Sequence, residues 1–282
     1  MRLRLQRRTW AAAGAAFAAC VTFSTTATAA APGQPHLTVP ANAASPAVDR
    51  HSVVYTAPIT IPAGAVGSGG AACPAGTVVT GGGESNSSVG GVTLHDTYAS
   101  SNTSWAVFVT NTSSADATFV VYAVCWSGIT NYQQLTTAWQ GDSRYAGGPA
   151  WCPDGLQRLG GGGWYDPPFD GWIDSGPGGD GWFFSLTINR SVAGTSQVIC
   201  GTGMANIQLA TGGSPIGAGQ EGVAVAACPD ATYVLSGGIG TAPGSRPSRP
   251  TDSYPDDETW RDYAYNETDG TTNVAVDLIC GA

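Results

Sequence analysis

Two segments of the chain place acidic side chains next to aromatic ones. The candidate ligand-binding residues are Trp164, Tyr165, Asp170, Trp172 and Asp174 in the first segment, and Tyr254, Asp256 and Asp257 in the second. Aromatic faces stack on sugar rings, while carboxylates accept hydrogen bonds from hydroxyl groups. The two segments therefore indicate a surface that binds a glycan or another extracellular partner.

The same carboxylates permit two other kinds of chemistry. Two carboxyl groups with separated pKa values hydrolyse glycosidic bonds, and Asp170 or Asp174 together with Asp257 would form such a pair. Clustered aspartates also hold calcium through oxygen ligands, although the EF-hand spacing is absent here. A purely structural alternative is that the segments are solvated turns whose aromatic rings cap a small core. No two segments supply a convergent acid, base and nucleophile, so we predict no catalytic residue, cofactor or metal.

The chain contains three copies of a sequence repeat that begins and ends with a cysteine, and these repeats must position the two segments. The copies begin at Cys73, Cys152 and Cys228, which are 79 and 76 residues apart, and they close on Cys125, Cys200 and Cys280. The seventh cysteine, Cys20, lies in the expected secretion signal, so the mature chain keeps six. Six cysteines in a secreted chain favour disulfides, and the absence of any Cys-x-x-Cys pair argues against zinc. The repeat predicts the pairs Cys73–Cys125, Cys152–Cys200 and Cys228–Cys280.

Alternating and β-branched residues predict strands throughout each copy, and no amphipathic helical stretch of useful length is present. The internal period implies three equivalent units at about 55–130, 131–205 and 206–282. We therefore expect one all-β domain over 55–282. A β-trefoil and three small β-sandwiches are alternative arrangements of the same strands.

Glycines and asparagines recur at fixed places in the three units. Gly81–Gly83, Gly160–Gly163 and Gly237–Gly238 are followed by neither a helix nor a lysine, so they do not form a phosphate loop. We expect bulges, or points where another strand's backbone comes close. Asn111, Asn189 and Asn266 end the tryptophan strands, which predicts hairpin turns that use left-handed backbone geometry.

This pattern of Cys-Pro-x-Gly, glycine-rich turn and apolar-apolar-Cys resembles vitelline membrane outer layer proteins. It also resembles secreted actinobacterial proteins that carry the same repeat. Ile59–Gly64 is similar to the lead-in of the former family, and Asp256–Thr259 is similar to its acidic turn. The resemblance covers about 55–282 and implies a three-repeat β-prism with pseudo-threefold symmetry, although the period is longer and the family's extra cysteines are missing. It implies no activity.

The N-terminal region has the features of a secretion signal over residues 1–30. Arg2, Arg4, Arg7 and Arg8 precede an apolar run, and cleavage is expected near Ala29 to Ala31. The apolar run is too short for a permanent membrane span. Residues 31–54 are expected to be a flexible arm, and His36–Val39 and Ser52–Tyr55 are short strand-like pieces. Such an arm could pair with another chain's sheet edge; the alternative is a simple linker.

The charge of the chain restricts its partners. The formal net charge is −9, and it becomes −13 once four signal arginines are removed; the chain contains no lysine. Such a chain repels phosphate backbones, so we expect no nucleic acid and no membrane insertion. We predict a secreted, non-catalytic interaction protein that binds an extracellular protein through its arm and diverged loops, with possible use as an adaptor. The alternatives are a lectin that uses the aromatic-acidic segments for surface glycans and, less favoured, a glycoside hydrolase.

Overall fold

The structure is a computed structural model that describes residues 50–141, 146–166, 172–187, 191–241 and 248–282. Every regular element in these ranges is a β-strand, and the paired strands run antiparallel. The all-β prediction is therefore confirmed. Nowhere in these ranges is there a helix of the length and hydropathy that would cross a membrane.

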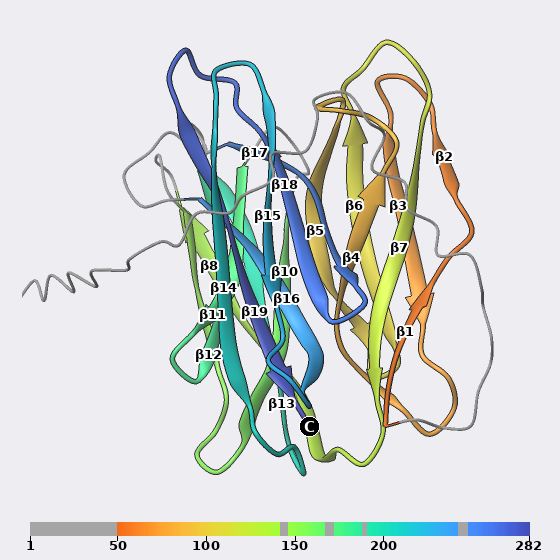
Figure 1. Ribbon diagram of the computed structural model, residues 1–282, viewed down its shortest axis with the longest axis vertical. Helices are drawn as coiled ribbons and strands as arrows, with labels where there is room; N and C mark the ends of the chain where they lie inside the picture. Colours follow the sequence, from red (N-terminus) through yellow and green to blue (C-terminus); the bar gives the residue numbers. More distant parts are fainter. Residues whose placement is uncertain (1–49, 142–145, 167–171, 188–190, 242–247) are drawn as a thin grey trace, which may run out of the picture.

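The largest sheet is built from the first and third units (Figure 1). Its strand order is β1-β7-β4-β17-β18-β15, with β2 also paired to β7. The strands are β1 (His51–Tyr55), β2 (Ile59–Ile61), β4 (Val78–Asn86), β7 (Ala117–Trp126), β15 (Glu221–Ala227), β17 (Arg249–Asp256) and β18 (Thr259–Tyr265). A single registered pair, Ser253 with Glu84, joins the two halves of this sheet.

The six-stranded sheet combines the first and second units in the order β3-β6-β5-β10-β13-β8. Its strands are β3 (Val66–Ala72), β5 (Val92–Ser101), β6 (Ser104–Asn111), β8 (Thr130–Gly141), β10 (Gln157–Asp166) and β13 (Val192–Thr202). Here too one registered pair, Gly163 with Thr97, joins the contributions of the two units.

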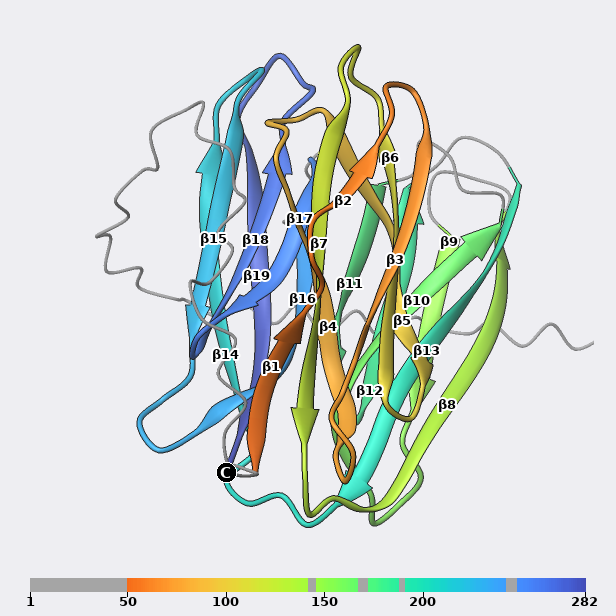
Figure 2. The ribbon, with the colours of Figure 1, turned by 90° about the vertical axis from the view of Figure 1, so that its right-hand side faces the viewer.

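Two three-stranded sheets contain the remaining strands of the second and third units. One holds β11 (Trp172–Gly178), β12 (Gly181–Thr187) and β9 (Ala146–Trp151); the other holds β14 (Gln208–Ile216), β19 (Thr272–Gly281) and β16 (Tyr233–Thr241). Every unit is thus divided between two sheets. Figure 2 views the molecule from the side where β3 and β7 lie in front; these strands of the first unit belong to different sheets. Two of the sheets combine strands of two units, and one apolar core cluster includes residues of all three, so the units are not independent of one another.

The repeated glycines allow the units to meet. A bulge lies at the start of each glycine stretch, where the register shifts between Val79 and Gly81, Arg158 and Gly160, and Val234 and Ser236. Two residues beyond the bulge, a Cβ on Gly83, Gly162 or Gly238 would overlap the carbonyl oxygen of Ser253, Thr97 or Ser175 in the neighbouring unit. Both roles expected of the glycines, bulge and close approach, are therefore confirmed.

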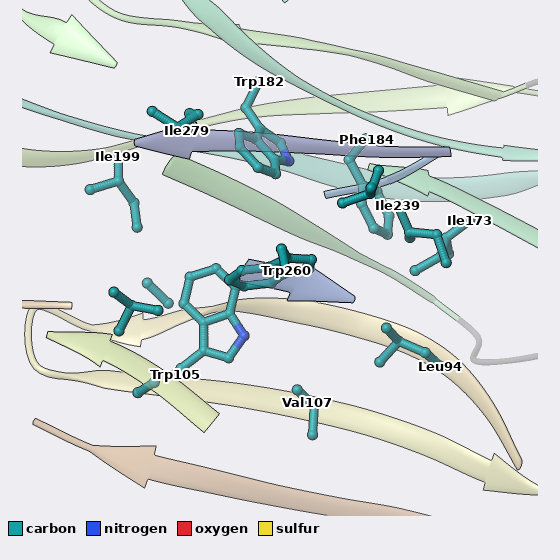
Figure 3. Packing of buried hydrophobic residues seen from close by; sticks show 14 of the residues in the cluster. Leu94, Trp105, Val107, Ile173, Trp182, Phe184, Ile199, Ile239, Trp260 and Ile279 are labelled. Atoms are coloured by element: carbon teal, nitrogen blue, oxygen red, sulfur yellow. The ribbon is translucent and has the colours of Figure 1, made fainter. Parts of the chain in front are cut away.

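Three equivalent tryptophans fill the centre of the core (Figure 3). Trp105, Trp182 and Trp260 are at most 1% exposed, and each packs on the middle glycine of a unit. Each indole N–H donates to a hydroxyl oxygen, at 2.9 Å in all three units; the acceptors are Thr97, Ser175 and Ser253. One continuous cluster of buried apolar residues surrounds them and includes all three units.

The disulfides have the predicted pairing, Cys73–Cys125, Cys152–Cys200 and Cys228–Cys280. The second cysteine of each pair is fully buried, at the end of a central strand. Each bridge ties this strand to the loop that opens the same unit, so the three covalent links lie within units and the joints between units are non-covalent.

The asparagines at the ends of the tryptophan strands stabilise the turns in another way than we expected. Asn111 and Asn266 do not have the positive φ of a left-handed turn. Their side chains instead donate to three backbone carbonyls, which for Asn266 belong to Ile216, Gly217 and Gly270. The side-chain oxygen accepts hydrogen bonds from the residue two positions later. Asn189 lies outside the described residues.

We expect Asn266→Asp to destabilise the protein by about 3 kcal/mol, because a carboxylate would then face three carbonyl oxygens in a buried site. Urea unfolding monitored by circular dichroism measures this change. Asn102→Asp is the control, since Asn102 is exposed at a hairpin turn. Equal unfolding midpoints for the two variants would contradict the bonding role of Asn266.

The N-terminal arm is shorter than the sequence suggested. Residues 51–55 form β1, which pairs along its whole length with β7 of the same chain, from His51 opposite Trp126 to Tyr55 opposite Tyr122. The strand-like piece Ser52–Tyr55 is therefore the edge strand of its own chain's seven-stranded sheet. Residues 31–49 lie outside the described part of the chain.

Candidate functional site

A shallow pocket of about 520 Å³ lies at one end of the six-stranded sheet. Three adjacent strands line it: β8 with Ala138–Gln140, β10 with Trp164–Asp166, and β13 with Ala193–Thr195. Asp166 and Gln140 are exposed, and Trp164 and Thr195 are half-buried, so these four side chains face outward. The pocket thus combines one aromatic face with a carboxylate, an amide and a hydroxyl.

The aromatic wall of this pocket is supported from the neighbouring unit. Trp164 packs against Tyr98 of β5, with ring centroids 4.8 Å apart and an interplanar angle of 45°. Trp164 stands three residues after the glycine under Trp182, a place occupied by Ser85 and Gly240 in the other units. The fold therefore does not require an aromatic residue here.

Tyr165 supports the pocket from beneath and does not project from it. Its side chain is 3% exposed, and its hydroxyl lies 2.7 Å from Nδ1 of His95. The other ring nitrogen of His95 lies 2.5 Å from the hydroxyl of Thr110. This buried chain of hydrogen bonds fixes the inner face of β10, so the neighbouring Trp164 is held by rigid backbone.

Asp174, also predicted to bind a ligand, stands at a repeated position whose two counterparts make structural hydrogen bonds. Asp96, Asp174 and Asp252 are spaced by 78 residues and occupy equivalent positions at the junctions between units. Asp96 accepts a hydrogen bond from the Tyr165 amide at 3.1 Å, and Asp252 accepts one from the Asn86 amide at 2.5 Å. Burial raises the pKa of Asp96 to about 7, and burial together with the charge of Asp277 raises the pKa of Asp174 to about 6.

The residues predicted in the third unit lie on the seven-stranded sheet, apart from the pocket strands. Tyr254 is 2% exposed and packs between Tyr122 and Tyr263, so its faces are covered. Asp256 is paired with Arg261 at 2.6 Å. Asp257, with a φ of 52°, forms the turn between β17 and β18. These three residues do not join Trp164 in one site.

Two predicted residues cannot be placed. Asp170 lies outside the described residues, and only the backbone of Trp172 is described, as the first residue of β11. The pair Asp170 with Asp257 therefore has no described geometry. In the pair Asp174 with Asp257, Asp174 lies on β11, whereas Asp257 lies in the turn between β17 and β18 of another sheet.

A further set of carboxyl groups is fully buried beneath the seven-stranded sheet. Glu84 and Asp262 flank Ser253 in register across β4, β17 and β18, and both are 0% exposed. Burial, followed by the charge of Asp252, raises the pKa of Glu84 well above its usual value. Burial likewise raises the pKa of Asp262 well above its usual value. In both groups the protonated form is favoured by burial.

The residues that complete the pocket around Trp164 were not predicted from the sequence. Tyr98, Gln140, Asp166 and Thr195 come from four strands of two units, and pairing of β10 with β5 and β13 brings them together. Asp166 was detectable, because it follows Trp164–Tyr165 directly. The others have no local signal, since they approach only through strand register.

No family model matches the chain, and the search of curated proteins also returned no match. Among the described residues, no three His, Cys, Asp or Glu side chains gather as a metal-binding group. The pocket around Trp164 is therefore the feature of the protein that indicates a function.

Proposed function

We propose that this protein is a secreted, non-catalytic carbohydrate-binding protein whose ligand occupies the Trp164 pocket. The observation that carries the proposal is the meeting of Trp164 with Asp166, Gln140 and Thr195 around one open hollow. A pyranose ring would lie on the indole face, and its hydroxyl groups would bond to the carboxylate, amide and hydroxyl. Shallow hollows of this kind suit the end or side of a saccharide chain.

Several features support a binding role. Trp164 departs from the residues at equivalent positions, Ser85 and Gly240, whereas the surrounding scaffold repeats. The pocket strands are held by close β10–β13 and β13–β8 pairing, so the site is built before the ligand arrives. Preorganised polar groups bind with a smaller entropic cost.

Secretion and the architecture form part of the same proposal. The basic, apolar and small-residue segments of residues 1–30 support export, and three disulfides are typical of extracellular proteins. The division of each unit over two sheets supports a β-prism of the kind found in vitelline membrane outer layer proteins. Capture of a protein partner by residues 31–49 rests on the sequence alone, and deletion of those residues, which should abolish the capture, tests it.

Trp164→Ala is expected to weaken saccharide binding at least about tenfold, since a half-buried tryptophan in a binding hollow contributes more than 1.4 kcal/mol. Affinity electrophoresis through gels containing soluble xylan, mannan, β-glucan or glycol chitin measures the change as lost retardation. Trp164→Phe should retain part of the retardation because it keeps an aromatic face.

Tyr233→Ala is the matched control, because Tyr233 is another surface aromatic, 44% exposed, that is outside the pocket. This variant should migrate as the wild type does in every gel. If the wild type is not retarded by any of the four polysaccharides, or if Trp164→Ala is retarded equally, the proposed function is wrong.

A further inference from the structure

Two exposed aromatic rings meet on the outer face of the sheet formed by β9, β12 and β11. Trp151 is 51% exposed and Phe183 is 37% exposed. Their ring centroids lie 5.6 Å apart, and the rings are nearly perpendicular, at 85°. We call this pair the Trp151 platform. It lies on a different sheet from the Trp164 pocket.

The platform rests on a rigid base. A Cβ on Gly178 would overlap the ring of Phe183, and a Cβ on Gly181 would come within 2.5 Å of Trp151, so glycine backbone lies directly under both rings. Arg158 donates hydrogen bonds to the carbonyls of Gly179 and Gly181. These hydrogen bonds hold the glycine backbone of the base in place.

Comparison of the three units indicates that the scaffold does not need these residues. The residue before the first cysteine is Trp151 in the second unit but Ala72 and Ala227 in the others. The residue after the core tryptophan is Phe183 in the second unit but Ala106 and Arg261 in the others.

A third departure lies at the base. At the bulge the second unit has Arg158, where the other units have the fully buried Val79 and Val234. Three independent departures from the repeat thus converge on one place.

The surroundings of the platform supply polar groups for a saccharide. Asp180 is exposed in the hairpin turn between the two glycines that Arg158 contacts. The charges of Asp180 and Asp277 both act on Arg158, and burial lowers the pKa of Arg158. A carboxylate beside two aromatic faces accepts hydrogen bonds from sugar hydroxyls.

The size of the platform argues against a protein partner. Trp151 and Phe183 are each about half exposed or less, and together the two rings present on the order of 200 Å² of apolar surface. A stable protein interface buries about 800 Å² on each partner. One sugar ring, in contrast, covers an area similar to that of an indole.

We propose that the Trp151 platform is a second saccharide site, which binds one pyranose ring on Trp151 with Phe183 at its edge. This inference deepens the proposed function and rests on it. Because the Trp164 pocket lies on another sheet, two sites would contact two points of a polysaccharide. Linked contacts raise apparent affinity through effective concentration, without any change in either site.

The test uses the full mature chain and suspensions of insoluble cellulose, chitin, β-1,3-glucan and mannan. Protein depletion from solution is measured for the wild type, Trp151→Ala, Phe183→Ala, Trp164→Ala and the Trp151→Ala/Trp164→Ala double variant. We expect Trp151→Ala to weaken binding about tenfold and the double variant to bind less than either single variant. Val225→Ala, which removes an apolar side chain that is 43% exposed elsewhere, should bind as the wild type does.

Alanine at position 151 should preserve the fold, since the equivalent positions carry Ala72 and Ala227, and the melting temperature of each variant checks this. If Trp151→Ala is depleted from solution as much as the wild type and only Trp164→Ala is depleted less, the platform is not a saccharide site. That result would leave the proposed function intact. Absence of wild-type depletion by all four polysaccharides would overturn both. The proposal would also be wrong if the wild type sediments as a dimer and Trp151→Ala sediments as a monomer. The platform would then be a self-association surface.

Discussion

Gly162→Ala is expected to lower the free energy of unfolding by about 3 kcal/mol or more, although it adds only one methyl group. A Cβ at this position would overlap the carbonyl oxygen of Thr97 in the neighbouring unit. Neither backbone can retreat, because β5 is paired to β6 and β10 is paired to β13 on their other edges. The new methyl group must therefore separate the two halves of the six-stranded sheet.

Gly83→Ala should have the same effect on the seven-stranded sheet, where its Cβ would overlap the carbonyl oxygen of Ser253. Equilibrium urea unfolding measures both variants. Gly270→Ala is the matched control, since no atom lies within 4 Å of a Cβ there, and it should be neutral or slightly stabilising. If all three variants unfold at the wild-type midpoint, close approach of the backbones is not what the glycines provide.

Stability is expected to fall as the pH rises from about 5 to 8, and Glu84→Gln should reduce this fall. Burial raises the pKa of the Glu84 carboxyl in the folded state, so the folded protein holds a proton that the unfolded chain releases. Such a group contributes its full stabilisation below its unfolded pKa, near 4, and loses it as the pH rises toward the folded pKa. Asp262 acts in the same direction.

Asp96 contributes to the same slope. Its pKa rises from 3.8 to about 7, and a difference of this size corresponds to roughly 4 kcal/mol lost between acidic and neutral pH. Urea midpoints at pH 5, 6, 7 and 8 measure the slope for the wild type, Glu84→Gln and Asp262→Asn. Asp269→Asn, a change at an exposed carboxylate, should leave the slope unaltered. A wild-type midpoint that rises with pH would contradict the assignment.

The sequence predicted the scaffold better than the site because the scaffold repeats. Cysteines, glycines and tryptophans recur at a nearly constant interval, so one pairing of Cys73 with Cys125 implies the other two. The joining of units was not predictable, because it depends on which strand edges meet. The close approach at Gly83 was expected, but the identity of its neighbour, Ser253, was not.

Asp174 illustrates why the site was harder to predict. Its sequence neighbours are aromatic and acidic, which suggested a ligand, whereas its interval of 78 residues from Asp96 and from Asp252 marks a structural repeat. Local composition does not report which face of a strand a residue occupies. Trp151 shows the reverse case, because it directly precedes a repeated cysteine and was not among the predicted site residues, although about half of its surface is exposed.

The division of every unit between two sheets determines the order in which the chain can become complete. Asn86 donates to Asp252, and the two residues are 166 positions apart. The first unit therefore keeps an open sheet edge at β4 until β17 has been synthesised and has reached it. Contacts between such distant residues slow folding and require nearly the whole chain. A protein truncated after the second unit would present an unpaired edge at β4, and aggregation is the expected fate of such an edge.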